Sequence, residues 1–207
     1  MKQLNNITTL IFDFGGVIVN LDLPQCIQNF KDLGLNDVEK YLSNFGQSGF
    51  FLKWESGGLS IDEFRNEIRS LTTTVLTDKQ IDDAWCSFLV DIPVEKIELL
   101  KQLRMKFKLL LLSNTNPLHI GVSATKEFRK YGGTMYDFFD RCYLSYEMGM
   151  VKPNAEIFEA LLIDANVKAE ECLFIDDGQK NIDTASKLGI QTYLVTPNDD
   201  LFFLLAL

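Results

Sequence analysis

The sequence is poor in positive charge and contains a single histidine. Its 207 residues include 20 Lys and Arg against 29 Asp and Glu, which gives a formal net charge of −9. An acidic chain is a poor partner for nucleic acids and anionic membranes, so we expect it to bind neither. An anionic substrate would therefore need local help from a lysine, from backbone N–H groups or from a metal ion.

Paired cysteines and long apolar runs are also missing. The four cysteines form no CxxC pair and residues 1–9 are polar, so we expect reduced thiols in a cytoplasmic protein. No apolar run approaches the ~20 residues that span a bilayer. We interpret the apolar tail, residues 201–207, as a helix or strand that docks on the core, with a membrane anchor as a remote alternative. The composition, 46% hydrophobic and 24% charged, fits a globular protein with a real core. We expect a monomer or homodimer, between which the sequence does not decide.

Short apolar segments alternate with helical patterns along much of the chain. Helical spacing of apolar residues occurs at 93–105, 154–166 and 181–188, and Gly189 is a suitable cap for the last helix. This alternation predicts an α/β fold with a Rossmann-like, doubly wound parallel sheet, whose ligands bind at the carboxyl ends of the strands. The predicted strands are 8–12, 108–112, 141–144, 171–175 and 191–195.

Residues 20–90 break this alternation, because they show helical periodicity and no convincing strand. Ser60 and Glu63 form a capping box at the start of one predicted helix. An all-helical insert directly after the first strand would lie over the ligand-binding edge of the sheet, where a lid excludes water. We therefore predict a core domain of residues 1–19 and 91–207 and a helical cap domain of residues 20–90, with helices at 23–33, 38–45, 61–71 and 78–88.

The insert also contains aromatic residues and glycines whose roles the sequence leaves open. Phe50, Phe51 and Trp54 either line a substrate pocket or form the core of the insert. The glycines are either hinges for a moving cap or ordinary turn residues, and they stand at positions 46, 49, 57 and 58.

Residues suited to chemistry stand at the ends of four predicted strands. Asp13 ends the first strand, Ser113 begins a polar run after the second, Lys152 follows the third, and Asp176-Asp177 ends the fourth. Any one of them could be a helix cap or a surface residue. Their joint occurrence at one edge of a parallel sheet instead predicts a single site.

The chemistry of these residues fits a phosphorylated ligand. Several carboxylates at one edge repel each other and need a cation, and oxygen ligands suit Mg²⁺, which bridges to phosphate. Lys152 would neutralise a phosphoryl group, while Ser113 and Asn114 would hydrogen-bond its oxygens. Asp13, left sterically open by the glycines that follow it, is then the candidate to attack phosphorus and form an aspartyl-phosphate.

These segments resemble the four motifs of the haloacid dehalogenase superfamily hydrolases, and the resemblance covers nearly the whole chain. The insert resembles the C1-type cap of the subfamily IA phosphatases. Residues 112–119 and 143–153 are similar to bacterial phosphatases of sugar phosphates such as glucose 1-phosphate. The matching segments are Phe12-Asp13-Phe14-Gly15-Gly16-Val17, Ser113-Asn114, Lys152-Pro153 and Asp176-Asp177.

The resemblance implies a Mg²⁺-dependent phosphatase of a small phosphorylated metabolite such as a sugar phosphate. Asp13 would be the nucleophile and a metal ligand, and Ser113 and Lys152 would be catalytic groups that hold the phosphate. The Gly15 carbonyl and Asp177 would bind the metal directly, and Asp176 would bind it directly or through water. Further phosphate donors would be Gly16, Asn114 and Asn116, although Asn116 could instead cap the helix that opens at Pro117.

Gly15 departs from the family pattern, which has a second aspartate there as general acid and base. Three interpretations stay open. In the first, the protein is a phosphatase in which His119 or Glu55 gives a proton to the leaving oxygen. Each residue also has a purely structural alternative: His119 could be packed at a helix start, and Glu55 could be a solvated residue of the cap. In the second, it is a dehalogenase in which Asp13 attacks carbon, which leaves Asp176-Asp177 as an unexplained repulsion. In the third, it is a catalytically weak protein that binds a phosphorylated metabolite.

Overall fold

A single five-stranded parallel sheet organises the molecule. The computed structural model describes residues 6–42, 47–196 and 199–207. The strand order is β3-β2-β1-β4-β5, so β1 lies in the centre, where Ile11 pairs with Leu110 on one side and Phe174 on the other. All five predicted strands and their parallel arrangement are confirmed. The strands are β1 (Thr9–Phe12), β2 (Lys108–Ser113), β3 (Arg141–Leu144), β4 (Cys172–Asp176) and β5 (Gln191–Leu194).

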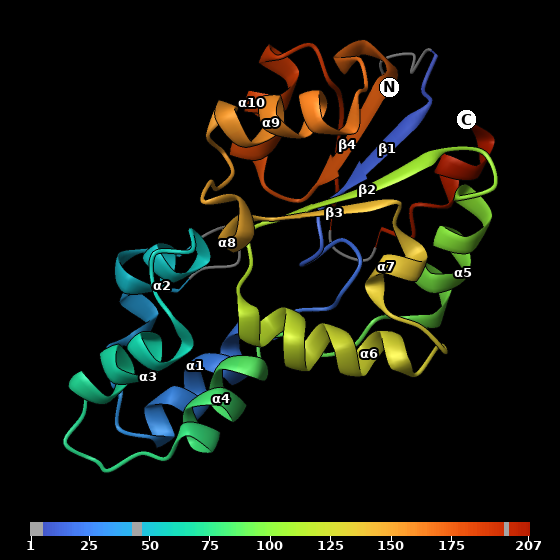
Figure 1. Ribbon diagram of the computed structural model, residues 1–207. Coiled ribbons are helices and arrows are strands. Elements are labelled where there is room, and N and C mark those ends of the chain that lie inside the picture. Colours follow the sequence, from blue (N-terminus) through green and yellow to red (C-terminus); the bar gives the residue numbers. More distant parts are fainter. Residues whose placement is uncertain (1–5, 43–46, 197–198) are drawn as a thin grey trace.

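Helices cover both faces of the sheet, as the alternation of elements predicts. Successive strand residues point to opposite faces, so Leu10 and Phe12 pack in one apolar cluster and Ile11 in the other. The Ile11 face is covered by α9 (Ala155–Ala165) and α10 (Gln179–Lys187) (Figure 1). The opposite face is covered by α5 (Val94–Leu103), α6 (Thr125–Arg129) and α7 (Met135–Phe138) (Figure 1).

The insert after β1 is built from helices that lie beyond the end of the sheet where the strands finish (Figure 1). The predicted helices at 23–33, 61–71 and 78–88 are confirmed, and so is the capping box, in which Glu63 N donates to Ser60 Oγ at 3.2 Å. The two connections to the sheet run side by side, because Asn20 N donates to Asp91 O at 2.8 Å. The helices are α1 (Leu23–Asp32), α2 (Gly49–Glu55), α3 (Ile61–Ser70) and α4 (Asp78–Cys86).

The sequence prediction for the insert is wrong at one helix and misses another. The helix predicted at 38–45 is a single 3-10 turn, η1 (Val38–Lys40), over its described part, since residues 43–46, including Phe45 and Gly46, lie outside the described residues. The missed helix is α2, whose seven residues are too few to show a helical period.

Aromatic side chains fill the interior of the insert. Phe51 and Trp54 are fully buried, and the Trp54 ring stacks on Phe64 with 3.6 Å between the ring centroids. Both residues therefore belong to the core of the insert and not to a substrate pocket. Gly49, the first residue of α2, and Gly57, in the turn after α2, have positive φ angles of 60° and 76°.

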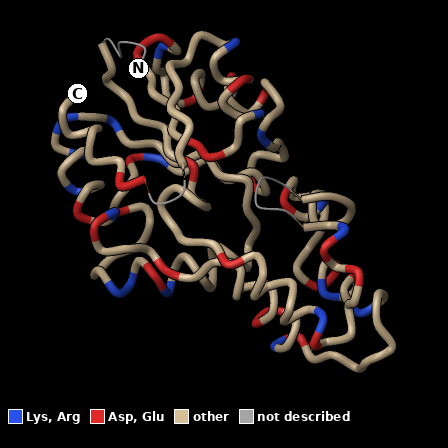
Figure 2. The backbone as a smooth tube through the Cα atoms, turned by 180° about the vertical axis from the view of Figure 1, so that it is seen from behind, with Lys and Arg blue, Asp and Glu red and all other residues tan. Residues whose placement is uncertain are grey.

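The C-terminal tail docks on the core as a short 3-10 helix, η4 (Phe202–Ala206), with Leu201 and Leu204 buried. Lys106 Nζ donates to Leu205 O at 2.9 Å. This confirms the predicted docking of the tail. Across the described ranges, no helix combines the length and the apolar character needed to cross a membrane. Basic and acidic residues are interspersed over the chain (Figure 2), so positive charge for an anionic ligand has to be supplied locally.

Candidate active site

The ends of β1, β2 and β4 surround a cavity between the sheet and the insert. Six of the predicted site residues line it, and they come from four separate places in the sequence. Parallel strands bring them together because their carboxyl ends share one edge of the sheet. These lining residues are Asp13, Gly15, Ser113, Asn114, Lys152 and Asp177.

Lys152 is the buried positive charge of this cavity. Its Nζ lies 2.9 Å from Asp13 Oδ1 and 2.7 Å from Asp176 Oδ2. Burial lowers the pKa of Lys152, but the two carboxylates outweigh it and hold the pKa above its ordinary value. The ammonium group therefore stays charged and holds Asp13 in place.

Three carboxylates crowd the same edge. One oxygen each from Asp13, Asp176 and Asp177 lie within 4.8 Å of one another. Burial raises the pKa of Asp13 well above its usual range, with Lys152 opposing and the other two carboxylates adding to the rise. Burial and the neighbouring Asp176 raise the pKa of Asp177 to about 6. A divalent cation would relieve this repulsion, and the oxygen donors suit Mg²⁺.

Both carboxylate oxygens of Asp176 accept hydrogen bonds from protein groups. Its Oδ1 accepts hydrogen bonds from Gly178 N at 2.7 Å and Asn181 Nδ2 at 2.9 Å, and its Oδ2 accepts from Lys152. The residue is fully buried and is not among the described residues that line the cavity. Of the two predicted modes of metal binding, this arrangement favours contact through water.

The two glycines after Asp13 have different structural roles. Gly16 has a φ of +72°, and a Cβ there would collide with the Asp177 carboxylate. Its N–H already donates to Val19 O at 2.9 Å, so the prediction that Gly16 donates to phosphate is not supported. Gly15 has no positive φ, and a Cβ there would lie 3.2 Å from Leu21 Cδ1. A side chain at Gly16 would thus displace Asp177, whereas a side chain at Gly15 would require only a small shift of the Leu21 side chain.

The polar residues after β2 mainly position other groups. Asn114 Nδ2 donates to Lys152 O at 2.9 Å, and Lys152 N donates to Asn114 Oδ1 at 2.8 Å. The Asn114 side chain therefore fixes the Lys152 backbone, which leaves its backbone N–H as the predicted phosphate donor. Ser113 is buried at the strand end with its Oγ 3.4 Å from Asn114 O.

Asn116 is predicted either to bind phosphate or to cap a helix, and the structure supports the cap. Its Oδ1 accepts from His119 N at 3.0 Å and from Trp85 Nε1 at 3.2 Å. The residue is fully buried and is not among the described residues that line the cavity. These contacts favour the capping role of Asn116 over phosphate binding.

The two candidates for the missing proton donor behave differently. His119 lines the cavity but stacks on Trp85, and its ring nitrogens lie 3.1 Å from Asn116 Nδ2 and 3.2 Å from Trp85 O. Burial lowers the pKa of His119 to about 4, which fits a packed structural residue. Glu55 also lines the cavity but is only 4% exposed, so the expectation that it is solvated is wrong. Burial raises the pKa of Glu55 to about 8, with Lys152 opposing.

Several lining residues were not predicted from the sequence. They are mostly apolar residues of the insert and its connections, where side-chain type gives no signal of contact with a ligand. They become recognisable only once the insert is folded over the sheet. Those of the insert and its connections are Val19, Leu21, Gln47, Phe88 and Leu89, and the core adds Phe14, Thr115, Gly178 and Asn181.

Comparison with known proteins supports the resemblance drawn from the motifs. A family model for haloacid dehalogenase-like hydrolases matches residues 7–189. The D-ribitol-5-phosphate phosphatase of Bacteroides thetaiotaomicron is 38% identical over 187 residues, which cover 90% of this chain and 91% of that protein.

Solved structures show the same similarity. A haloacid dehalogenase family enzyme from Bacteroides thetaiotaomicron, in complex with magnesium and inorganic phosphate, is 43% identical with a TM-score of 0.89, covering 96% of this chain and 98% of the other. A predicted hydrolase of the family from Porphyromonas gingivalis is 38% identical with a TM-score of 0.89, covering 97% of both chains. This chain therefore belongs to the haloacid dehalogenase-like hydrolases.

Proposed function

We propose that this hydrolase is a Mg²⁺-dependent phosphatase that removes the phosphoryl group from a small sugar or polyol phosphate. The observation that supports this most directly is Lys152 held between Asp13 and Asp176, beside a cluster of three carboxylates. A buried lysine next to three carboxylates that can bind a cation suits an anionic phosphoryl group better than a neutral substrate. The similarity to a D-ribitol-5-phosphate phosphatase over 90% of the chain supports the same substrate class.

The residues present fit a Mg²⁺ ion. Asp13 and Asp177 would hold it with the carbonyl of Gly15, and Asp176 would contact it through water. A bound ion would neutralise the phosphoryl oxygens and make phosphorus a better electrophile. The crowding of three carboxylate oxygens within 4.8 Å supports this site.

Asp13 is the proposed nucleophile. One of its carboxylate oxygens forms a bond to phosphorus while the bond between phosphorus and the leaving oxygen breaks, which gives an aspartyl-phosphate. Lys152 favours the ionised form of Asp13 and pairs with the phosphoryl oxygens, and Ser113 and the Asn114 N–H donate hydrogen bonds to them. Water then cleaves the aspartyl-phosphate and releases inorganic phosphate.

The helical insert is the proposed cap domain of this enzyme. Gln47, Glu55 and Phe88 of the insert line the same cavity as Asp13. Their position over the sheet edge suits a cap that excludes water and contacts the leaving group. Residues 20–90 would then set substrate specificity, while residues 1–19 and 91–207 supply the phosphate site.

The two alternatives explain the site less well. A dehalogenase that attacks carbon has no use for a cation, and the likeness to an L-2-haloacid dehalogenase, at 18% identity, shows the fold alone. A protein that only binds a phosphorylated metabolite needs no nucleophile, yet Asp13 is present and paired with Lys152.

A phosphate-release assay tests the proposal. We expect the protein to release inorganic phosphate from a panel of polyol and sugar phosphates with Mg²⁺ and not with EDTA. Asp13→Asn should abolish release, while Asp183→Asn, at an exposed position on α10, should match the unmodified protein. Halide release from 2-haloacids without phosphate release would favour the dehalogenase, and tight ligand binding without turnover would favour the binding protein.

A further inference from the structure

The proposed phosphatase reaction, on which this inference rests, needs a proton donor that Gly15 cannot provide. The alkoxide of a sugar or polyol is a poor leaving group, so proton transfer to its oxygen accelerates bond cleavage by ~10²–10⁴. The space next to residue 15 is occupied by Leu21, whose Cδ1 lies 3.2 Å from the position of a Cβ. The proton must therefore come from elsewhere in the cavity.

The ionisable side chains that line the cavity, within the described part of the chain, can be assigned one by one. Asp13 is the nucleophile, Asp177 faces the metal site, and Lys152 is bonded to two carboxylates. His119 has both ring nitrogens within hydrogen-bond distance of protein groups and lies under Trp85. Only Glu55 is left without a role in binding phosphate or metal or in packing.

The fold fixes Glu55 relative to the phosphate site. Ser145 Oγ donates to Glu55 O at 2.6 Å, and Thr115 N donates to the same hydroxyl at 2.9 Å. One buried hydroxyl thus joins the end of α2 to the loop that follows β2. The contact lies between the insert and the sheet, so the last residue of α2 cannot shift without breaking it.

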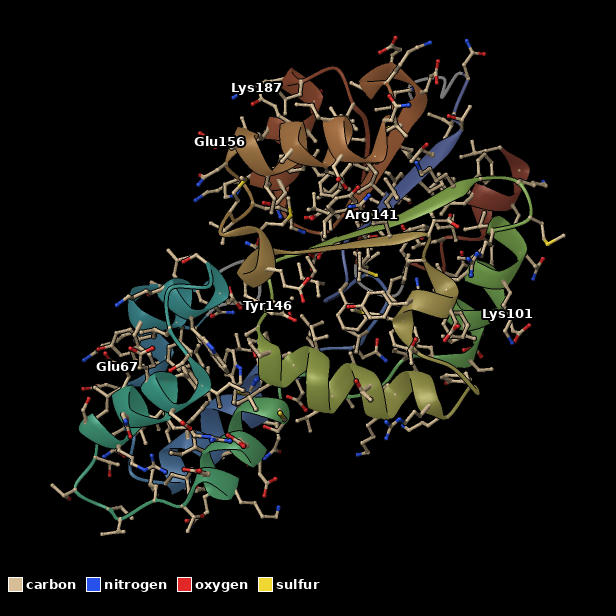
Figure 3. All side chains as sticks on the ribbon, in the orientation of Figure 1. Glu67, Lys101, Arg141, Tyr146, Glu156 and Lys187 are labelled. Atoms are coloured by element: carbon tan, nitrogen blue, oxygen red, sulfur yellow. The ribbon has the colours of Figure 1, made fainter. Side chains whose placement is uncertain are left out.

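A second contact holds the same turn. Gly57 has a φ of +76°, and a Cβ there would collide with the Tyr146 carbonyl, so the two backbones lie in direct contact. Tyr146 lies in α8 (Ser145–Met148), where the core meets the insert (Figure 3). Two neighbouring contacts therefore fix Glu55 of the insert at the cavity that Asp13 and Lys152 of the core also line.

The environment of Glu55 suits proton transfer. The side chain is 4% exposed, and desolvation raises its pKa to about 8, so it holds a proton near neutral pH. An acid whose pKa lies near the working pH can both donate and accept a proton efficiently. The carboxyl group is buried but reaches the cavity, where a leaving group would lie.

We propose that Glu55 is the general acid and base of this active site, in place of the carboxylate that Gly15 lacks. As Asp13 bonds to phosphorus and the bond to the leaving oxygen breaks, Glu55 gives its proton to that oxygen. In the second step the Glu55 carboxylate takes a proton from water while the water oxygen bonds to phosphorus and the Asp13 oxygen departs. Glu55 ends the cycle protonated, so atoms and charges balance.

The test compares two leaving groups in single-turnover experiments. p-Nitrophenyl phosphate releases an acidic phenol that needs no proton, whereas D-ribitol 5-phosphate releases an alkoxide that does. We expect Glu55→Gln to slow the first turnover of ribitol phosphate by ~10²–10⁴ and to leave the first release of nitrophenolate unchanged. Glu67→Gln is the matched control, because Glu67 is an exposed residue of α3 away from the sheet (Figure 3).

Each outcome separates this inference from the proposed function. An equal loss on both substrates, or a ribitol phosphate rate equal to that of Glu67→Gln, would overturn the role of Glu55. Absence of Mg²⁺-dependent release from both substrates by the unmodified protein would instead overturn the phosphatase. If Glu55→Gln does not fold, Glu55→Asp replaces it: a shortened acid should give a smaller loss with the same selectivity for ribitol phosphate.

Discussion

The indole N–H of Trp85 donates to Oδ1 of Asn116 at 3.2 Å, and this bond joins α4 of the insert to the loop that follows β2. The same oxygen accepts the backbone N–H of His119 at 3.0 Å, so it caps the following helical turns as well. Both side chains are buried. The contact between Trp85 of the insert and the core therefore requires a hydrogen-bond acceptor at position 116, and this requirement does not depend on the substrate.

Replacement of Asn116 tests this structural role. We expect Asn116→Ala to lower the free energy of unfolding by about 1–3 kcal/mol, because it removes a helix cap and leaves a buried indole donor unpaired. Urea unfolding measures the change. The double variant Asn116→Ala/Trp85→Phe should lose less than the sum of the two single variants, since no donor is then left unpaired. If Asn116→Ala instead raises KM and leaves the free energy of unfolding unchanged, Asn116 binds the phosphate of the substrate.

Lys152 offers a contrast between a buried and an exposed charge. In the Mg²⁺-free protein we expect Lys152→Met to lower the free energy of unfolding by about 3–5 kcal/mol, because two buried carboxylates lose their counter-charge. Lys168→Met is the control: Lys168 pairs with Glu171 but its side chain is 69% exposed, so its replacement should change the free energy of unfolding far less than that of Lys152. Equal losses in the two variants would show that the Lys152 pairs do not stabilise the fold.

The strands and the four motifs could be predicted from sequence because their signals are local. A buried parallel strand is a short apolar run, and Asp13 or Asp176 stands out as a charge directly after such a run. The position of Glu55 could not be predicted, since its burial depends on the contacts that α2 makes with Ser145 and Tyr146. Those contacts join residues about 90 positions apart, and α2 is too short to show a helical period.

The donors expected from Gly16 and Asn116 already have partners within the protein, which sequence could not show. The residue types were suitable, but the Gly16 N–H is used by Val19 and the Asn116 side chain by His119 and Trp85. A sequence motif shows which groups can bind a phosphate. Only the folded chain shows which of them are already bonded.

Gly16 provides a separate test of the metal site. Gly16→Ala forces a Cβ against the Asp177 carboxylate in a backbone conformation with φ of +72°. Gly149→Ala is the matched control, because its φ of +67° is similar but its Cβ would meet nothing within 4 Å. Both variants should lose about 1 kcal/mol of stability from backbone strain. Only Gly16→Ala should weaken Mg²⁺ binding, measured by calorimetry; equal Mg²⁺ affinities would remove Asp177 from the proposed ligand set.

His119 predicts how stability depends on pH. Burial holds its pKa at about 4 in the folded protein, below its ordinary value, so the unfolded chain takes up a proton first as the pH falls. The stability that neutral His119 contributes is complete above about pH 6.5 and is lost progressively towards pH 4, at up to about 1.4 kcal/mol per pH unit. Urea unfolding of the Mg²⁺-free protein and of His119→Gln at several pH values isolates this effect, because the other titrating groups are common to both. The difference in unfolding free energy between the two should shrink as the pH falls, and a constant difference would show that His119 is solvated in the folded protein.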